Sequence, residues 1–255
     1  ATSHQEALLK LLSEPNIASK HWIIRQYDHE VQGNTVIKPL SGPGRRGPSD
    51  AAVLQPVPFF GRGVAVACGL QTSLGDASAG GDPYQMAIAA IDECIRNLVC
   101  VGADPARVAI LDNFCWPSCE KPENMAALVR ACLGCYDGAM AYRTPFVSGK
   151  DSLNNQLRYL DPATGESRVI EIPYTLLITG LGIVPRIQEA ITMDAKSPGR
   201  LLVVVGTTDD RMAGSMYQKY FDVSPDANAA SIPTVDLATG PRTARAVSMM
   251  IQEGA

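Results

Sequence analysis

The stretch that decides the fold is residues 82–102, which read DPYQMAIAAIDECIRNLVCVG. Asp82 is a good N-cap residue, Pro83 suits the first helical position, and Gln85 completes a capping-box-like pair. Gly102 is a natural helix terminator. Apolar residues recur at helical spacing and predict one buried face, made of Ala87, Ala90, Ile91, Cys94, Leu98 and Val101.

Apolar runs on both sides of this helix predict the strands of a sheet. The expected strands lie at residues 52–58, 63–70, 107–111, 145–147 and 174–184, with a hairpin at 158–168. A second helix begins near Pro122, and we expect it to bury Met125, Leu128, Val129, Cys132, Tyr136 and Met140. This order of elements predicts an α+β fold with helices packed on one face of a mixed or antiparallel sheet.

Shorter elements are expected outside this central block. Residues 5–12 and 18–27 are helix candidates, and a Pro/Gly-rich connector follows at 39–48. Residues 200–205 open a new strand and 242–252 form a last helix, with no obvious partner for that strand. Because a single strand leaves its backbone groups unpaired, we expect the chain to be a piece of a longer protein.

The composition narrows the class of protein. The 255 residues carry a net charge of −4 and are 46% hydrophobic, which is typical of a globular protein with a sizeable core. The negative balance argues against a general nucleic-acid partner. No apolar run reaches the roughly 18 residues of a membrane span, and the first residues lack a signal-peptide pattern. We expect a cytoplasmic protein without a membrane partner.

Four of the seven cysteines leave two interpretations open. The spacing of Cys115, Cys119, Cys132 and Cys135 resembles that of zinc ligands. Cys132 and Cys135 also fall inside the second helix, where Cys132 continues the apolar stripe and a buried thiol is common. The buried-thiol interpretation is favoured, and the odd number of cysteines suits a reducing compartment.

A polar run, Ser148-Gly149-Lys150-Asp151-Ser152, follows the apolar residues 145–147 and is expected to form a turn. A glycine there allows main-chain N–H groups to approach an anion closely. Lysine supplies a charge for phosphate, while Asp and Ser can reach a metal or a ligand hydroxyl. An ordinary polar turn after a strand is the alternative.

Four further residues are candidates for metal or ligand binding. Glu93 and Asn97 are four apart on the first helix, so they share a face at the edge of the apolar stripe and suit Mg²⁺; a solvated helix face is the alternative. Asp112 directly follows the strand expected at 107–111. It is either part of a ligand site at the strand end or a turn residue that caps nearby N–H groups. Asp50 is a ligand or a simple strand-entry residue. No Ser/His/Asp or Cys/His arrangement is persuasive.

Six segments, spread over nearly the whole chain, resemble one family of enzymes. They are WIIRQYDHEVQG (22–33), GPSDAAV (47–53), ECIRNL (93–98), DNFCWP (112–117), KPE (121–123) and GKDSL (149–153). Together they resemble the second half of phosphoribosylformylglycinamidine synthases, members of the superfamily of aminoimidazole ribonucleotide (AIR) synthetase-like enzymes.

The resemblance implies a duplicated architecture of A and B domains. Residues 1–35 would be the tail of a preceding B domain with its linker. Residues 36–186 would be the second A domain, which is similar to the N-terminal domain of AIR synthetase. Residues 187–255 would be the truncated start of the second, α/β B domain.

The resemblance also implies a reaction, an ATP-dependent C–N ligation in de novo purine biosynthesis. In this family the oxygen of formylglycinamide ribonucleotide is activated by phosphoryl transfer, and ammonia from a glutaminase subunit or domain displaces phosphate. ATP or ADP and Mg²⁺ are the implied cofactors. The first A/B half of the protein and the glutaminase are the implied partners, and a homodimer through the A-domain sheet is expected.

Site residues follow from the same resemblance. Asp112, Gly149 and Lys150 would contact ATP, and Ser152 would contact the substrate. Many small family members have Gly-Asn-Val-Ser where this chain has Gly149–Ser152, and a protonated lysine cannot ligate a metal. Asp151 is therefore the candidate metal neighbour in this run.

A second nucleotide site is implied as well. Asp50, Glu93 and Asn97 are similar to the Mg²⁺ ligands of that site in the large single-chain members. The family's catalytic histidine belongs to the first A domain, so no catalytic residue is assigned to this chain and the chain alone is expected to be inactive. The alternative function is a non-catalytic half that holds a structural ADP with Mg²⁺.

Overall fold

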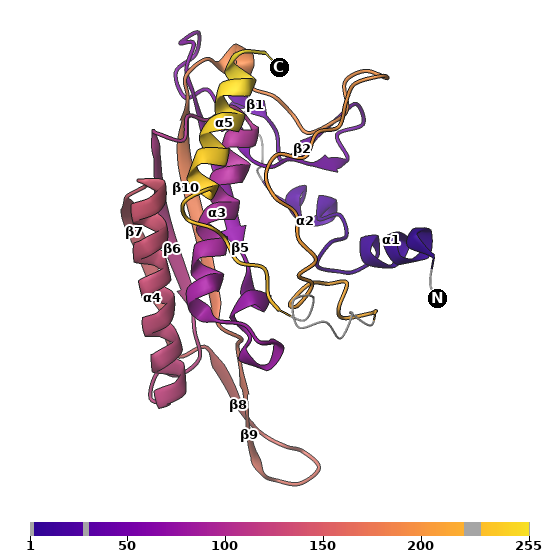
Figure 1. Cartoon of the computed structure of the whole chain (residues 1–255). Coiled ribbons are helices and arrows are strands. Elements are labelled where there is room, and N and C mark those ends of the chain that lie inside the picture. The colour runs from indigo at the N-terminus through magenta and orange to yellow at the C-terminus, as the bar shows by residue number, and fades with distance from the viewer. Residues whose placement is uncertain (1–2, 28–30, 222–230, 255) are drawn as a thin grey trace.

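The computed structural model of the chain describes residues 3–27, 31–221 and 231–254. Its centre is a six-stranded sheet with the order β1-β4-β5-β10-β6-β7 (Figure 1). The pairing of β6 with β7 is parallel and every other pairing in this sheet is antiparallel. The strands are β1 (Thr35–Ile37), β4 (Ala52–Leu54), β5 (Gly63–Leu70), β10 (Thr175–Val184), β6 (Val108–Cys115) and β7 (Phe146–Ser152). The predicted α+β fold with a mixed sheet is confirmed.

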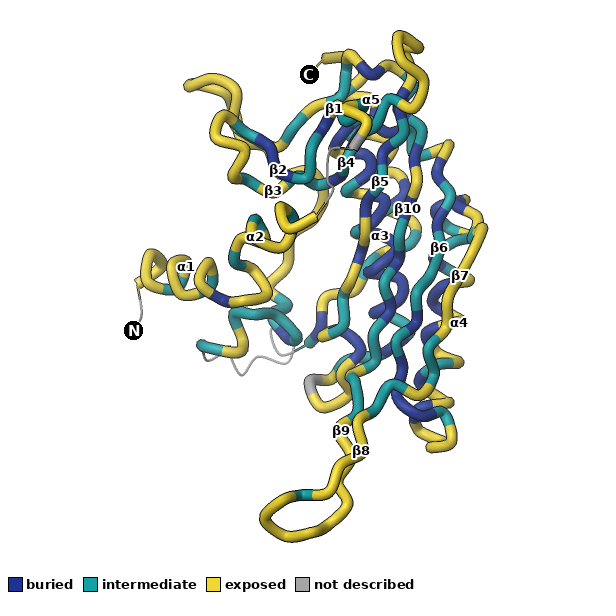
Figure 2. The backbone as a smooth tube through the Cα atoms, turned by 180° about the vertical axis from the view of Figure 1, so that it is seen from behind, coloured by how far each residue is buried: buried dark blue, intermediate teal, exposed yellow. Residues whose placement is uncertain are grey.

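Two long helices, α3 (Pro83–Cys100) and α4 (Pro122–Tyr142), cover one face of this sheet (Figures 1 and 2). Glycines on the strands let α3 approach closely. A Cβ atom at Gly69 of β5 would lie 1.9 Å from the carbonyl oxygen of Ala90, and one at Gly180 of β10 would lie 2.6 Å from Cys94 Sγ. The helix backbone therefore rests almost directly on the sheet.

The start of α3 is tied to α4. Asp82 caps α3 as predicted, since its carboxylate accepts a hydrogen bond from Tyr84 N at 3.1 Å. The predicted reciprocal pair with Gln85 does not form, and Gln85 Oε1 is buried without a hydrogen-bond partner among the described residues. Asp82 instead accepts a second hydrogen bond from Arg130 Nε of α4 at 2.7 Å.

The buried face predicted for α4 is wrong except at Leu128, which is half-buried and packs against the core. Met125, Val129, Tyr136 and Met140 are 43–64% exposed, and Cys132 is exposed as well. The residues packed inward are mostly small, namely Ala127, Ala131, Gly134 and Gly138, joined by Asn124, Cys135 and Tyr142. A Cβ atom at Gly134 would lie 2.4 Å from the carbonyl oxygen of Tyr84. Because the helices approach so closely, small side chains face inward and bulky ones face outward.

The expected turn at residues 148–152 is also wrong, because these residues extend β7 along the edge of the sheet. The neighbouring strand β6 runs on to Cys115, so Asp112 lies inside the strand rather than at its end. Both differences have one cause. Parallel pairing of β6 with β7 continues through polar residues, from Leu111 opposite Ser148 to Cys115 opposite Ser152.

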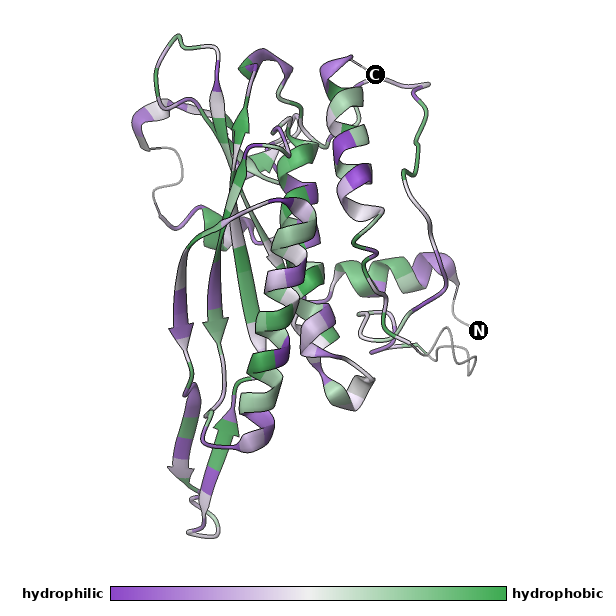
Figure 3. Cartoon of the chain, turned by 60° about the vertical axis from the view of Figure 1, so that its left-hand side comes forward, coloured by the Kyte–Doolittle hydropathy of each residue, from purple (hydrophilic) through white to green (hydrophobic). Residues whose placement is uncertain are grey.

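The remaining elements surround this core. Residues 158–168 form the predicted hairpin, and α5 carries the predicted last helix, with hydrophilic and hydrophobic residues interleaved along it (Figure 3). The strand predicted at residues 200–205 is wrong, since no strand forms there and Leu202 is 100% exposed. Residues 28–30 of the family-like segment lie outside the described residues. The elements outside the six-stranded sheet and its two long helices are α1 (His4–Leu12), α2 (His21–Ile24), η1 (Val31–Gly33), β2 (Leu40–Ser41), β3 (Gly47–Pro48), η2 (Thr72–Gly75), η3 (Ala77–Ala79), β8 (Gln156–Leu160), β9 (Ser167–Glu171), η4 (Ile187–Glu189) and α5 (Gly240–Gln252).

The long helices α3 and α4 leave the second face of the sheet uncovered (Figure 2). Alternate residues of β10 are buried toward α3, and the residues between them, such as Leu177 and Leu181, are half-buried or exposed. Within the described part of the chain, no helix is long and apolar enough to cross a membrane.

The contact between Gly69 and Ala90 gives a stability test. We expect Gly69→Ala to lower the free energy of unfolding by about 1–3 kcal/mol, because the new methyl group meets rigid helix backbone. Urea denaturation measures the change. Gly61→Ala is the matched control, since nothing lies within 4 Å of a Cβ atom there. Equal stability of the two variants would contradict this packing.

Candidate functional site

Two aspartates, Asp112 of β6 and Asp151 of β7, lie on the face of the sheet that α4 covers. Asp112 pairs with Gly149 across the parallel strands, and Asp151 pairs with Phe114. Paired residues point to the same side of a sheet. A Cβ atom at Gly149 would lie 2.4 Å from Asp112 Oδ1, so the missing side chain leaves room for the Asp112 carboxylate.

The surroundings of Asp112 disfavour its negative charge. Burial raises the pKa of Asp112, and the charge of Asp151 raises it further. The partial desolvation of Cys132 on α4, which remains exposed, and the charges of Asp151 and Asp112 raise the pKa of its thiol, and burial raises the pKa of Cys135 to about 12. Neither aspartate has an ion-pair partner within the described ranges. Two adjacent carboxylates without a cation suit a divalent metal, and Mg²⁺ typically takes one or two carboxylates plus phosphate oxygens.

Lys150 and Ser152 lie on the opposite, open face of the sheet. Successive side chains of a strand alternate between faces, so they point away from Gly149 and Asp151. Lys150 Nζ donates a hydrogen bond to Ser152 Oγ, which keeps the two side chains together. The structure therefore brings Asp112, Gly149 and Asp151 together and separates Lys150 and Ser152 from them.

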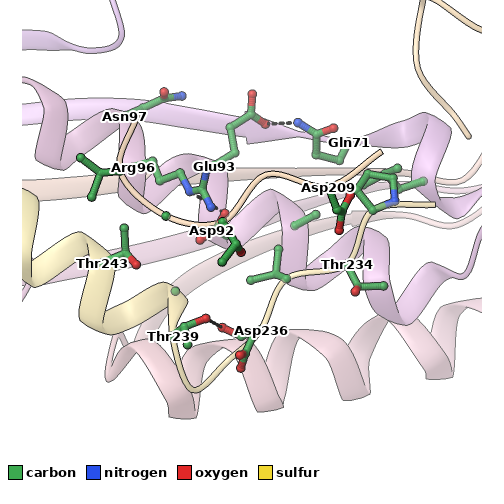
Figure 4. A pocket seen from close by; sticks show the side chains of 18 residues that line it. Gln71, Asp92, Glu93, Arg96, Asn97, Asp209, Thr234, Asp236, Thr239 and Thr243 are labelled. Atoms are coloured by element: carbon green, nitrogen blue, oxygen red, sulfur yellow. Dashed lines mark hydrogen bonds and ion pairs between the residues drawn. The ribbon is translucent and has the colours of Figure 1, made fainter. Parts of the chain in front are cut away.

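Glu93 and Asn97 line a separate cleft of about 450 Å³ between α3 and the segments near residues 205–209 and 233–243 (Figure 4). Glu93 Oε2 accepts hydrogen bonds from Leu70 N at 2.7 Å and from Gln71 Nε2 at 3.0 Å. Asn97 Nδ2 donates to the carbonyl oxygen of Cys68 at 2.9 Å. This face of α3 is thus bonded to the end of β5 while it borders the cleft.

Sequence reasoning missed the charged pair of Asp92 and Arg96, which lies beside Glu93 and Asn97 on α3. Asp92 is 6% exposed, and its carboxylate binds Arg96 Nε at 2.8 Å and accepts a hydrogen bond from Tyr142 OH of α4. A Cβ atom at Gly240, the first residue of α5, would lie 2.4 Å from Tyr142 OH. Asp92 therefore joins α3, α4 and the start of α5. The available signal was an acidic residue four positions before Arg96 on the helix.

Asp50 lines another cavity, of about 720 Å³, together with Cys68, Lys20 and parts of α1 and α2. Burial raises the pKa of Asp50. The residues that line this cavity and those that line the cleft of Glu93 do not overlap. Asp50 is thus not gathered with Glu93 and Asn97 in one cavity. Among the described residues there is no group of three or more His, Cys, Asp or Glu side chains able to hold a metal ion.

The chain belongs to the family of AIR synthase related proteins, since the N-terminal domain of that family matches residues 48–184. Its relatives include the phosphoribosylformylglycinamidine synthase subunits PurL of Gloeobacter violaceus and Methanocaldococcus jannaschii. The first is 37% identical over 228 residues, covering 85% of this chain and 27% of the relative. The second is 35% identical over 249 residues, covering 97% and 31%. The chain spans less than a third of the length of these relatives.

Solved structures support the fold. The PurLQS structure from Thermotoga maritima matches with a TM-score of 0.52 and 23% identity, over 70% of this chain and 25% of that chain. Thermotoga maritima PurL complexed with AMPPCP matches with a TM-score of 0.50 and 23% identity, over 70% and 26%. At this identity the likeness concerns the fold alone.

Neutralising Asp112 tests the repulsion between the two aspartates. Because its folded pKa is raised above the value of about 3.9 for an unfolded chain, the folded state binds this proton more tightly. Ionisation of Asp112 therefore lowers the free energy of unfolding as the pH rises through this acidic window. We expect Asp112→Asn to raise the free energy of unfolding at neutral pH, because the amide carries no charge to be repelled by Asp151. Urea denaturation at several pH values measures it.

Asp151→Asn completes a double-mutant cycle with this variant. If the two carboxylates repel each other, the double variant gains less stability than the sum of the single gains. Strictly additive effects would show that Asp112 and Asp151 do not interact.

Proposed function

We propose that this chain forms part of a phosphoribosylformylglycinamidine synthase and contributes a metal–nucleotide site to the amidation of formylglycinamide ribonucleotide. The observation that carries the proposal is the likeness to PurL subunits, at 34–37% identity over 84–99% of this chain. We divide the chain into the tail of a B domain (1–35), an A domain (36–186) and the start of another B domain (187–255). The remaining domains, and a glutaminase that supplies ammonia in the cytoplasm, complete the enzyme.

The reacting site is proposed at Asp112, Gly149 and Asp151. The two carboxylates fit Mg²⁺ because they lie on one face without a cation of their own, and Gly149 gives Asp112 the space it occupies. When bound, Mg²⁺ would neutralise the negative charge on the phosphoryl group during its transfer. The part of this chain is to hold the metal between the half-buried Asp112 and the exposed Asp151, where Asp112 is partly shielded from water and attracts the metal more strongly.

Lys150 and Ser152 are assigned to anionic groups that approach the open face. Lys150 supplies a positive charge for a nucleotide phosphate, and Ser152 supplies a hydroxyl for the substrate, with their mutual hydrogen bond holding both in position. The first A domain of the enzyme, packed on this face, would close the site around them. In the chain by itself, the same open face of the sheet supports a homodimer. A purely monomeric sedimentation profile at high protein concentration would contradict this homodimer.

A second candidate function is favoured by the cleft in Figure 4. Its volume of about 450 Å³ lies within the range of about 300–1,000 Å³ typical of small-molecule sites. Glu93 and Asn97 border it, and the Arg96 guanidinium and several threonine hydroxyls could bind phosphate there. In this alternative the cleft holds a structural ADP with Mg²⁺. Asp50 lines the neighbouring cavity, and it would contact this Mg²⁺ only if that cavity opened toward the cleft.

Two substitutions in the whole synthase separate these functions. We expect Asp112→Asn to lower kcat about 10²–10³-fold, because stabilisation of the developing charge is lost. Glu93→Gln should leave kcat nearly unchanged and lower the melting temperature by a few degrees, because its hydrogen bonds to Leu70 and Gln71 weaken. Steady-state turnover and thermal unfolding measure both. Unchanged turnover in Asp112→Asn would contradict the assignment of the reacting site to this chain.

A further inference from the structure

The loop between β4 and β5, residues 55–62, exposes large apolar side chains at the end of the sheet opposite the β8–β9 hairpin (Figure 1). Phe59 is 102% exposed, Val57 58% and Phe60 53%. Phe59 also has a φ of 63°, a conformation that bulky residues rarely adopt. An exposed aromatic residue in a disfavoured backbone conformation is costly in a monomer, and such features concentrate where ligands or partners bind.

The loop is held in place despite its exposure. Gln55 Nε2 donates to the carbonyl oxygen of Phe60 at 3.0 Å, and Gln55 N donates to that of Asn34 at 2.8 Å. The carbonyl oxygen of Gly61 accepts a hydrogen bond from Ile187 N at 2.9 Å. The aromatic residues are therefore presented by an anchored loop, which lowers the entropy that binding would cost.

An apolar pocket lies beside the loop. Pro56, Val57, Phe60, Val64 and Ile183 form its walls, and its volume is about 200 Å³. Pockets for whole small molecules usually occupy about 300–1,000 Å³. The smaller size suits one large apolar side chain instead.

Two guanidinium groups, of Arg62 and Arg107, complete the lining of this pocket. Arg62 lies over the Phe60 ring at 5.6 Å from its centroid. Neither arginine has a carboxylate partner in the described part of the chain. The chain as a whole carries a net charge of −4, so this positive pair is a local departure from its surroundings. Arginine and aromatic residues together are typical of the centres of protein interfaces.

We propose that the loop at residues 55–62 and the adjoining pocket dock an acidic segment of a partner protein. The segment inserts one large apolar side chain between Phe60, Val64 and Ile183, and its flanking carboxylates pair with Arg62 and Arg107. The negative charge of the whole chain disfavours nucleic acid as the occupant. This docking surface lies at the other end of β5 from Leu70 and Glu93, and its walls Val64 and Ile183 belong to one end of the open face of the sheet.

The test uses nuclear magnetic resonance of the chain labelled with ¹⁵N at its five phenylalanines. The probe is a peptide with blocked termini in which one phenylalanine stands between two pairs of glutamates. We expect it to shift the amide signals of Phe59 and Phe60 saturably and to leave buried Phe114 unchanged. Control peptides replace the glutamates by lysines or the phenylalanine by alanine, and both should bind more weakly.

Two variants and a matched control define the role of the arginines. Arg62→Gln and Arg107→Gln should each weaken peptide binding about three- to fivefold, as expected for an exposed ion pair. Arg158→Gln, an exposed position on β8, should leave it unchanged. The Phe114 signal reports that each variant is folded.

Several outcomes would overturn the proposal. They are no shift at millimolar acidic peptide, equal binding of the lysine peptide, or equal effects of Arg62→Gln and Arg158→Gln. Shifts of Phe59 and Phe60 caused instead by an oligouridine, or by vesicles of phosphatidylserine and phosphatidylcholine, would assign the surface to nucleic acid or membrane and would equally overturn it.

Discussion

The rest of the structure depends on the direct contact between α3 and the glycines of the sheet. Gly69 lets the backbone of α3 approach so closely that a Cβ atom would meet the carbonyl oxygen of Ala90, and Gly180 leaves room for the side chains of Cys94 and Leu98. Gly134 and Gly138 of α4 continue this packing on the flank of α3, where their Cβ atoms would meet Tyr84 and Ile91. Close approach of backbone to backbone fixes helix positions more tightly than bulky side chains can, because interiors are packed without spare volume.

That packing determines where chemistry is possible. With α4 held against α3, it lies over the face of β6 and β7 that bears Asp112 and Asp151, of which Asp112 is half-buried and Asp151 exposed. The other side of α3 borders the cleft that contains Glu93 and Asn97, and the buried Asp92 links α3 to α4 and α5. One helix thus separates two candidate sites, and strand alternation separates Lys150 and Ser152 from both.

The sequence predicted the elements with strong local signals. The cap at Asp82, the stop at Gly102, the strand at residues 63–70 and the hairpin at 158–168 follow from residues that act within a few positions of one another. The inward face of α4 could not be predicted in this way, because whether Gly134 or Tyr136 faces inward depends on how close α3 comes. β1 was missed for a similar reason, since its three residues are defined by pairing with β4.

The candidate site was only partly predictable for a related reason. Read as a turn, Gly149–Ser152 can direct all its side chains to one ligand, whereas in a strand neighbouring side chains must diverge. The strand depends on β6, whose polar residues at 112 and 113 gave no local sign of continuing. The proximity of Asp112 to Asp151 is likewise a consequence of register. The partnership of Asp92 with Tyr142 joins residues fifty positions apart, which spacing within one helix cannot reveal.

The most direct test of the central claim locates the metal. Mn²⁺, added with ADP as a paramagnetic substitute for Mg²⁺, broadens the nuclear magnetic resonance signals of nearby backbone amides. Our account predicts that the amides of Gly149 and Asp151 broaden first, while those of Leu70 and Gln71 beside Glu93 remain sharp. Broadening that is confined to Leu70 and Gln71 would contradict it and would place the metal in the cleft instead.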